Sequence, residues 1–222
     1  MIKKVLNLAA KDLRLEFKKK TVIISLMLTT GMLILAPSYQ VEILRTRKLE
    51  IGMIVMWLIL VFNTLTLLNR SLAMEKEADC WDGLRLMPMS PRVILLGKFL
   101  FNIILMIINV LIIVPLYLLF YNVSIPSPLM TMAVIIISMA GFIWIGLLFS
   151  LLTLNTEGRD VLLPVIVLPI ALPIIMVALE ISLKTIQGAA LGEYWLKFVI
   201  MAGYEFFVGL GAFILFSRAM EN

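Results

Sequence analysis

Six long apolar runs divide this chain, and short charged or polar segments separate them. A helix needs about 20 mostly apolar residues to cross the hydrocarbon of a bilayer. Runs of this kind occupy residues 21–36, 51–72, 99–120, 129–154, 161–182 and 195–217. None of them alternates between apolar and polar residues, as the strands of a membrane barrel do. The pattern therefore predicts an all-α integral membrane protein with six transmembrane helices in one domain spanning 1–222, of which the first helix is the shortest.

Composition and charge agree with a membrane protein and suggest its orientation. The 222 residues are 62% hydrophobic and 15% charged, with a mean hydropathy of +1.08, which is too apolar for a water-soluble surface. If the N-terminus is inside, fourteen of the 19 Lys and Arg residues flank the spans on that side. Basic residues favour the cytoplasm. We therefore expect a multi-pass protein of the inner or plasma membrane with both termini in the cytoplasm, and the net charge of +5 needs no nucleic-acid partner.

The segment 1–20 has the pattern of an amphipathic helix. Leu6, Ala9, Leu13 and Phe17 recur at helical spacing, and basic residues occupy the other faces. Such a helix lies in the membrane interface. The segment is predicted to be an interfacial helix on the inner leaflet, and a simpler role as a topology anchor stays open.

A charged island stands out in the connection 73–91, between the second and third runs. Residues 74–88 carry four acids and two bases, and Ala73, Glu77, Cys80, Leu84 and Met87 fall on one helical face. A solvated linker has no need of the apolar residues in this island, which expose apolar surface unless a partner covers them. The island therefore predicts a contact helix that ends at Pro88 and Pro91, before Lys98 opens the third span. Its candidate contact residues are Glu75, Glu77, Asp79, Trp81, Asp82, Leu84, Arg85, Leu86 and Pro88. The connection 183–194 is predicted to be an external loop.

Several catalytic and cofactor motifs are missing from the sequence. Gly97-Lys98-Phe99 lacks the earlier glycine and the hydroxyl residue of a phosphate-binding P-loop. The chain has no histidine, which is a common general base, zinc ligand and haem ligand, and Cys80 is its single cysteine. We expect no catalytic residues, no metal site and no directly bound cofactor, so the chain reads as a non-catalytic membrane subunit.

Glu205 lies near the middle of the sixth run, where an ionisable side chain is costly. Protonation, or a polar partner such as Asn63, Asn102 or Asn109, would neutralise it. Two interpretations stay open: a packing or inter-subunit hydrogen bond, and a role along a substrate path.

The fifth run contains Pro164, Pro169 and Pro173. Each removes a backbone donor, so the helix is expected to kink or break. A helix that moves and a helix that is merely bent fit this pattern equally.

Two stretches give the chain a resemblance to a known family. The first runs from Asn69-Arg70 through Leu84 and Pro88 to Lys98, and the second is the segment 168–173, Leu-Pro-Ile-Ala-Leu-Pro. With the six spans and the leading amphipathic helix, they resemble the membrane subunit of an ABC-2 type transporter, and within that group the haem exporter B subunit (CcmB) family. The resemblance covers nearly the full length. The family tends to have an acid before the arginine and a glycine near position 79, where this chain has Asn69 and Asp79.

The resemblance implies a permease subunit that acts in cytochrome c maturation. It implies a separate CcmA-like ATPase, two copies of each subunit, CcmC-like and CcmD-like membrane partners, and release of a CcmE-like haem chaperone. Trp81, Leu84 and Leu86 would then anchor the loop helix in the ATPase, inside a charged rim. We expect the subunit to transmit ATP-driven movement without ligating the haem iron, with ATP bound in the partner and haem as a possible substrate of the complex.

Two other classes of function stay open from the sequence. One is an ABC-2 permease for another substrate, such as a lipid-linked glycan, a drug or a peptide. The other is a non-ABC membrane scaffold or a proton-coupled carrier that uses Glu205.

Overall fold

Helices make up nearly all of the structure. A computed structural model describes residues 2–18, 24, 27–35, 37, 48–77, 90–122, 125–153 and 156–221. Within these ranges the elements are helical and no strand occurs. They are α1 (Ile2–Lys18), α3 (Lys48–Glu77), α5 (Pro91–Tyr121), α6 (Pro128–Leu152), α7 (Arg159–Ile186), the short 3-10 helix η2 (Leu191–Glu193) and α8 (Trp195–Glu221).

Five of the described helices are long and apolar enough to cross a membrane. They contain the spans Leu49–Ser71, Pro91–Tyr121, Pro128–Leu152, Arg159–Ile186 and Trp195–Phe216. The spans coincide with the second to sixth apolar runs, which confirms the all-helical membrane class. The first run, 21–36, is described only at residue 24 and over 27–35, where the chain is helical. A span formed by this first run, which would bring the total to six, therefore stays a prediction.

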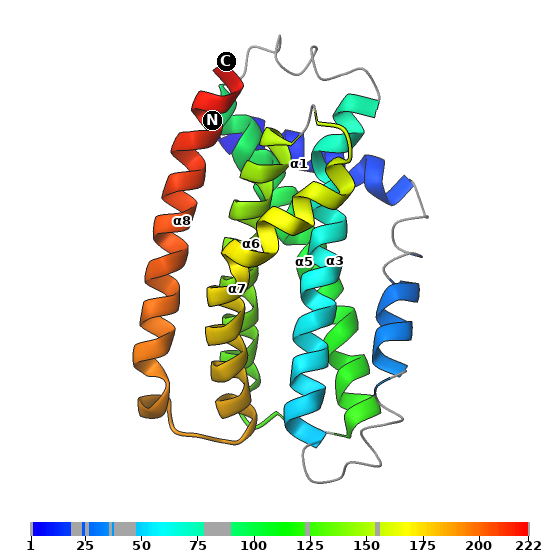
Figure 1. Ribbon diagram of the computed structural model, residues 1–222. Helices are drawn as coiled ribbons and strands as arrows, with labels where there is room; N and C mark the ends of the chain where they lie inside the picture. The colour runs from blue at the N-terminus through cyan, green and yellow to red at the C-terminus, as the bar shows by residue number, and fades with distance from the viewer. Residues whose placement is uncertain are drawn as a thin grey trace.

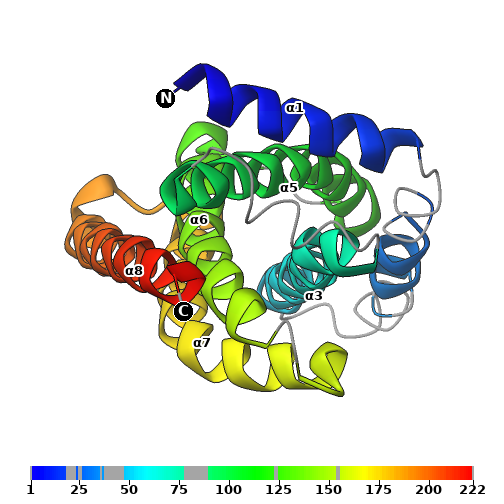
Figure 2. The same ribbon diagram turned by 90° about the horizontal axis from the view of Figure 1, so that it is seen from above.

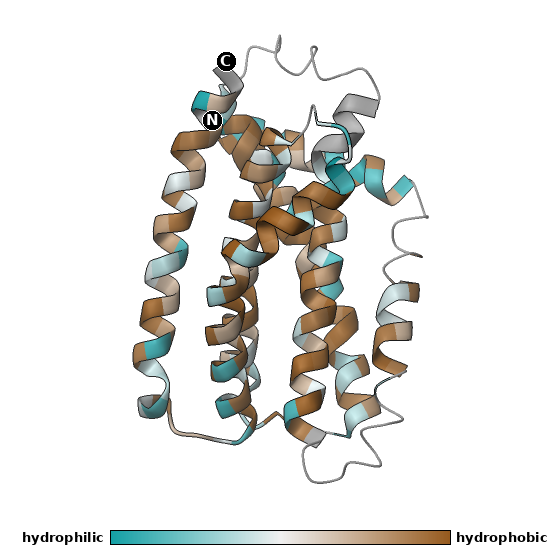
Figure 3. Cartoon of the chain, viewed as in Figure 1, coloured by the Kyte–Doolittle hydropathy of each residue, from teal (hydrophilic) through white to brown (hydrophobic). Residues whose placement is uncertain are grey.

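The five spans stand side by side, and α1 lies across one end of them. Figure 1 shows α1 and both chain termini at this end, which we call the α1 end. Viewed from above, α1 runs beside α5 (Figure 2), the helix it packs against. The start of α3 and the turn between α7 and α8 lie at the opposite end. Apolar residues dominate the length of the spans, and polar colours increase toward the two ends (Figure 3).

Helix α6 is the centre of the bundle, because it contacts α3, α5, α7 and α8. Its side chains Val134, Met139 and Phe142 have no exposed surface. Gly146 lets α3 approach closely, since a Cβ atom there would stand only 2.2 Å from Leu68 Cδ1. The core is thus built around one helix that is packed on several sides.

Two predicted boundaries were wrong. Helix α5 begins at Pro91, so Lys98 lies inside this helix instead of opening it, and the predicted end of the contact helix lies outside the described residues. Proline suits a first helical position, where its missing N–H leaves no bond unmade. At the opposite end, α7 continues to Ile186, so residues 183–186 of the expected loop are helical. The turn follows at Gly188, whose φ of 75° is a conformation that glycine adopts without strain.

Helix α1 is amphipathic, as predicted for segment 1–20, and it packs on the bundle with a face that the sequence analysis did not single out. Its buried residues are Leu8, Ala9, Asp12 and Glu16. Leu6 and Phe17, which belong to the predicted apolar face, remain 52% and 45% exposed. The bundle therefore receives a face that carries two acids, and much of the apolar face points elsewhere.

Helix α7 carries Pro164, Pro169 and Pro173 in its interior and is still a single helix from Arg159 to Ile186. In Figure 1 its first part runs obliquely and its second part runs along the bundle.

Candidate functional site

Buried polar side chains meet at the α1 end, around Lys98 of α5. Lys98 is only 2% exposed, and its Nζ lies 2.8 Å from Asp12 Oδ2 of α1. The same ammonium donates a hydrogen bond of 3.0 Å to the carbonyl oxygen of Ser71 in α3. One turn further along α5, Asn102 Nδ2 donates to Ser71 Oγ at 2.9 Å and to the Lys98 carbonyl at 2.8 Å. These four residues, Asp12, Ser71, Lys98 and Asn102, form what we call the Lys98 network, and they tie three helices together.

Because the two charges of the Lys98 network are buried, the stability of the fold depends on keeping them paired. The side chains of Lys98 and Asp12 are 3% and 6% exposed, so water screens neither charge. Removing one member of a buried ion pair leaves an uncompensated charge, which costs about 3–5 kcal/mol. Because each charge requires the other, the pair fixes where α1 sits on α5.

A second polar contact joins the other spans at the same end. Arg159, at the start of α7, donates from Nη2 to Ser150 Oγ of α6 at 2.6 Å. Ser150 Oγ in turn lies 3.4 Å from the carbonyl oxygen of Leu68 in α3, to which it donates. The α1 end therefore connects α3, α5, α6 and α7 through side-chain hydrogen bonds, and the Lys98–Asp12 ion pair adds α1.

Most of the predicted contact residues of the charged island lie outside the described residues. These are Asp79, Trp81, Asp82, Leu84, Arg85, Leu86 and Pro88, together with the side chains of Glu75 and Glu77, whose backbone belongs to α3. The proposed contact with an ATPase thus stays a prediction. The structure does describe both flanks of the island, α3 and α5, and the Lys98 network holds them together.

The intramembrane asparagines form two separate contacts. Asn63 Nδ2 of α3 donates to Thr30 Oγ1 at 2.8 Å and to Asn109 Oδ1 of α5 at 3.1 Å. This contact links the helical segment 27–35 to α3 and α5. Asn102 belongs instead to the Lys98 network. None of the three asparagines makes a hydrogen bond to Glu205, so we correct the expectation that one of them is its partner.

Glu205 of α8 is 8% exposed and faces α6 at Gly141. A Cβ atom at position 141 would stand 1.7 Å from Glu205 Oε2, so the absence of a side chain there makes room for the carboxylate. The carboxylate interacts with the Gly141 backbone, but neither oxygen has a hydrogen bond of ordinary geometry within the described residues. The acid therefore sits at a contact between two helices.

Sequence reasoning missed Asp12, Ser71 and Ser150 as parts of a site. Asp12 and Glu16 did carry a signal, because they are two acids one turn apart in a helix that is otherwise basic. Serines in apolar runs carry no comparable signal, since a hydroxyl can also bond within its own helix. In the described part of the chain, no group of three or more Cys, Asp or Glu residues could hold a metal ion.

The fold and this site define a multi-pass helical membrane protein whose spans are joined by buried polar contacts, with a buried lysine–aspartate pair at one end. The family model described as "CcmB protein" matches residues 3–219, so the chain belongs to the CcmB family. No curated protein was found to match the chain. Membership makes it a transmembrane, permease-type subunit of a haem exporter ABC system in cytochrome c maturation.

Proposed function

We propose that this subunit receives ATP-driven movement from a CcmA-like ATPase through residues 73–91 and passes it into the bundle. The observation that supports this is the Lys98 network. Ser71 lies near the end of α3 and Lys98 near the start of α5, so the network joins the two helices that flank the charged island. Movement of the island would therefore displace α3 and α5 together and carry α1 with them. On this proposal ATP is hydrolysed in the partner, and the subunit itself is non-catalytic.

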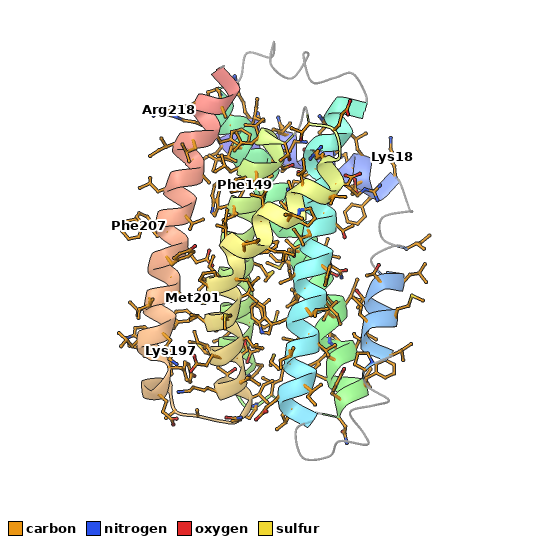
Figure 4. The ribbon with its side chains drawn as sticks, viewed as in Figure 1. Lys18, Phe149, Lys197, Met201, Phe207 and Arg218 are labelled. Atoms are coloured by element: carbon orange, nitrogen blue, oxygen red, sulfur yellow. The ribbon has the colours of Figure 1, made fainter. Side chains whose placement is uncertain are left out.

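The proposed topology has six spans, with the α1 end in the cytoplasm. Helix α1 and the start of α3 lie at opposite ends, so the chain between them has to pass from one end to the other. This favours a first span within 21–36. Lys18 and Arg218 lie at the α1 end and Lys197 at the other (Figure 4). The excess of cations near the α1 end supports a cytoplasmic location, where an ATPase can reach it.

The family supports a larger assembly. We propose two copies of this subunit with two ATPase subunits, associated with CcmC-like and CcmD-like proteins, in a complex that releases a CcmE-like haem chaperone. Since the chain has no histidine, the proposed role is transmission of movement, with the haem iron ligated by a partner.

The ATPase contact is tested by the double variant Trp81→Ala/Leu84→Ala. Truncating a buried interface anchor commonly costs about 2 kcal/mol or more, so co-purification of the ATPase should fall strongly while membrane insertion is kept. The matched control is Trp195→Ala/Leu196→Ala, which removes the same two residue types from exposed positions, 55% and 70% accessible, at the opposite end. Unchanged ATPase recovery in the first variant, or an equal loss in the control, would rule out the proposed contact.

The haem proposal is tested by titrating the purified subunit with haem. Only Met, Tyr and Cys80 side chains are available as axial ligands, and we expect no stoichiometric low-spin spectrum. A defined low-spin spectrum at one haem per chain would show that the subunit itself ligates the iron.

A further inference from the structure

Only one face of helix α1 packs on the bundle, and its other faces are exposed. The bundle takes the face that carries Asp12 and Glu16. Beside it, Ile2, Leu6 and Phe17 form an apolar face that is 77%, 52% and 45% exposed. An apolar face on a helix that lies across the end of a membrane bundle is suited to contact acyl chains. This contact would set the depth of α1 in the bilayer.

The remaining face of α1 is basic and is hollowed into a groove of about 400 Å³. The described residues that line this groove all belong to α1 and are Asn7, Ala10, Lys11, Arg14, Leu15 and Lys18. Lys11, Arg14 and Lys18 follow one another at three- and four-residue spacing, so they stand along one stripe of the helix. Asn7 extends this stripe by one turn with an amide donor, and Leu15, 44% exposed, adds an apolar edge.

We propose that this basic groove binds the phosphate headgroup of an anionic phospholipid. Arg14 and Lys18 are exposed, and guanidinium and ammonium groups form charge-assisted hydrogen bonds with phosphate oxygens. Lys11 is also 3.4 Å from Asp12, which places the groove directly beside the Lys98 network. Nothing in the membership of the CcmB family assigns such a site.

The neighbouring apolar face favours a lipid over a soluble acidic partner. With Ile2, Leu6 and Phe17 in hydrocarbon, long basic side chains on the adjacent face reach the level of the lipid phosphates. A water-soluble acidic protein would fill the groove but leave the apolar face uncovered. A phospholipid can contact both faces, because its acyl chains cover the apolar face while its phosphate lies in the basic groove.

The test compares two double variants of the full-length protein in a neutral detergent. Arg14→Gln/Lys18→Gln removes two cations from the groove, and Lys3→Gln/Lys4→Gln removes two from the same helix outside it. Binding of phosphatidylglycerol, and of phosphatidylcholine with the same chains, is titrated by native mass spectrometry. Cations near an anionic membrane surface contribute roughly five-fold each, so the groove variant should bind phosphatidylglycerol about 25-fold more weakly. The wild type and the control should both prefer phosphatidylglycerol.

Three results would overturn the proposal. Equal binding of the two lipids would show that no anionic site exists, and equal losses in both variants would show diffuse attraction to the whole helix. Retained lipid binding in the groove variant, combined with loss of the ATPase, would assign the groove to a protein partner. The single variant Lys18→Gln, at the last residue of α1, guards against misfolding and should show about a five-fold loss. ATPase recovery should stay unchanged throughout, which separates this site from the proposed coupling contact.

Discussion

The two ends of the bundle each hold a lysine–acid pair, and the pairs differ in burial. At the α1 end, Lys98 and Asp12 have side chains that are 3% and 6% exposed. At the opposite end, Lys197 and Glu180 also form a salt bridge, but their side chains are 42% and 47% exposed. The exposed pair lies near the ends of its two spans, where water or lipid headgroups can replace either partner, whereas the buried pair has no such substitute. The same chemistry therefore fixes helix positions at one end and contributes little at the other.

The pairs also differ in what they connect. Lys197 and Glu180 join α8 to α7, which are already neighbours along the chain. Close to this pair, Lys184 donates to the carbonyl oxygen of Glu193 at 3.2 Å, in another exposed contact. Lys98 and Asp12 join two helices that are distant in sequence, α5 and α1. The opposite end has buried inter-helix hydrogen bonds as well, from Trp57 Nε1 to Ser182 Oγ at 3.2 Å and between the hydroxyls of Thr131 and Thr185 at 3.0 Å, but these join neutral groups. Among the described residues, the buried lysine–acid pair lies at the end where we propose that movement enters.

The largest expected effect comes from Lys98→Met, which leaves the buried Asp12 with only the partly exposed Lys11, 3.4 Å away, as a counter-charge. We expect a loss of about 3–5 kcal/mol in the free energy of unfolding, measured by titration with sodium dodecyl sulfate in mixed micelles. Lys197→Met is the matched substitution at the opposite end. If the two variants lose equal stability, burial is not what distinguishes the ends.

The double variant Lys98→Met/Asp12→Leu removes both charges and should recover more than half of that loss. Replacing a buried ion pair by apolar side chains of similar size is often neutral or stabilising. The same unfolding titration on both single variants completes a double-mutant cycle, from which the coupling energy is obtained. Additive losses would mean that Lys98 and Asp12 act independently.

Arg159→Gln should have an intermediate effect. It removes the charged donor to Ser150 Oγ from a residue that is 9% exposed. Hydrogen bonds to charged groups contribute about 1.5–3 kcal/mol, and we expect a loss of that size in the unfolding titration. The control Arg218→Gln alters an exposed arginine at the same end and should stay within about 0.5 kcal/mol of the wild type.

The smallest effect is expected for Lys197→Gln, because the exposed pair it breaks is worth only about 0–1 kcal/mol. Raising the salt concentration should reduce even this difference, since ions screen exposed charges. A loss above about 2 kcal/mol, measured in the same way, would contradict the contrast between the ends.

Hydropathy predicted the spans better than their limits. Helix α3 begins at Lys48 and ends at Glu77, beyond the apolar run 51–72 on both sides. An apolar run reports contact with lipid or core, whereas backbone hydrogen bonds continue a helix into polar surroundings. The apolar run therefore identifies the membrane-crossing segment but does not determine where the helix begins and ends.

The orientation of α1 could not be read from its pattern. In a water-soluble protein the apolar face of an amphipathic helix packs on the core. Beside a membrane, lipid tails accept that face equally well, so a polar face can contact the protein instead. This is why Asp12 meets Lys98, while Leu6 and Phe17, which the sequence assigned to the membrane interface, stay exposed on α1.

Partners within the site required the tertiary structure. The sequence marked Asn63 and Asn109 as unusual positions, but only the packing of α3 on α5 brings them to 3.1 Å. Lys98 looked like a residue at the edge of a span, where a long side chain reaches toward water. Its burial depends on α1, which lies far away in the chain.

The pairing of α1 with α5 also has a consequence for biogenesis. Ribosomes synthesise Asp12 long before Lys98, so the carboxylate is already at the membrane surface when α5 arrives. A lysine that enters a membrane without a counter-charge is unfavourable, by roughly 2.5–3.5 kcal/mol at the centre of a span and by less near its end, where Lys98 lies. Helix α1 thus supplies the counter-charge, Asp12, before Lys98 of α5 reaches the membrane. A circular permutation that moves α1 behind α8 would keep every contact of the finished bundle but force Lys98 to insert alone.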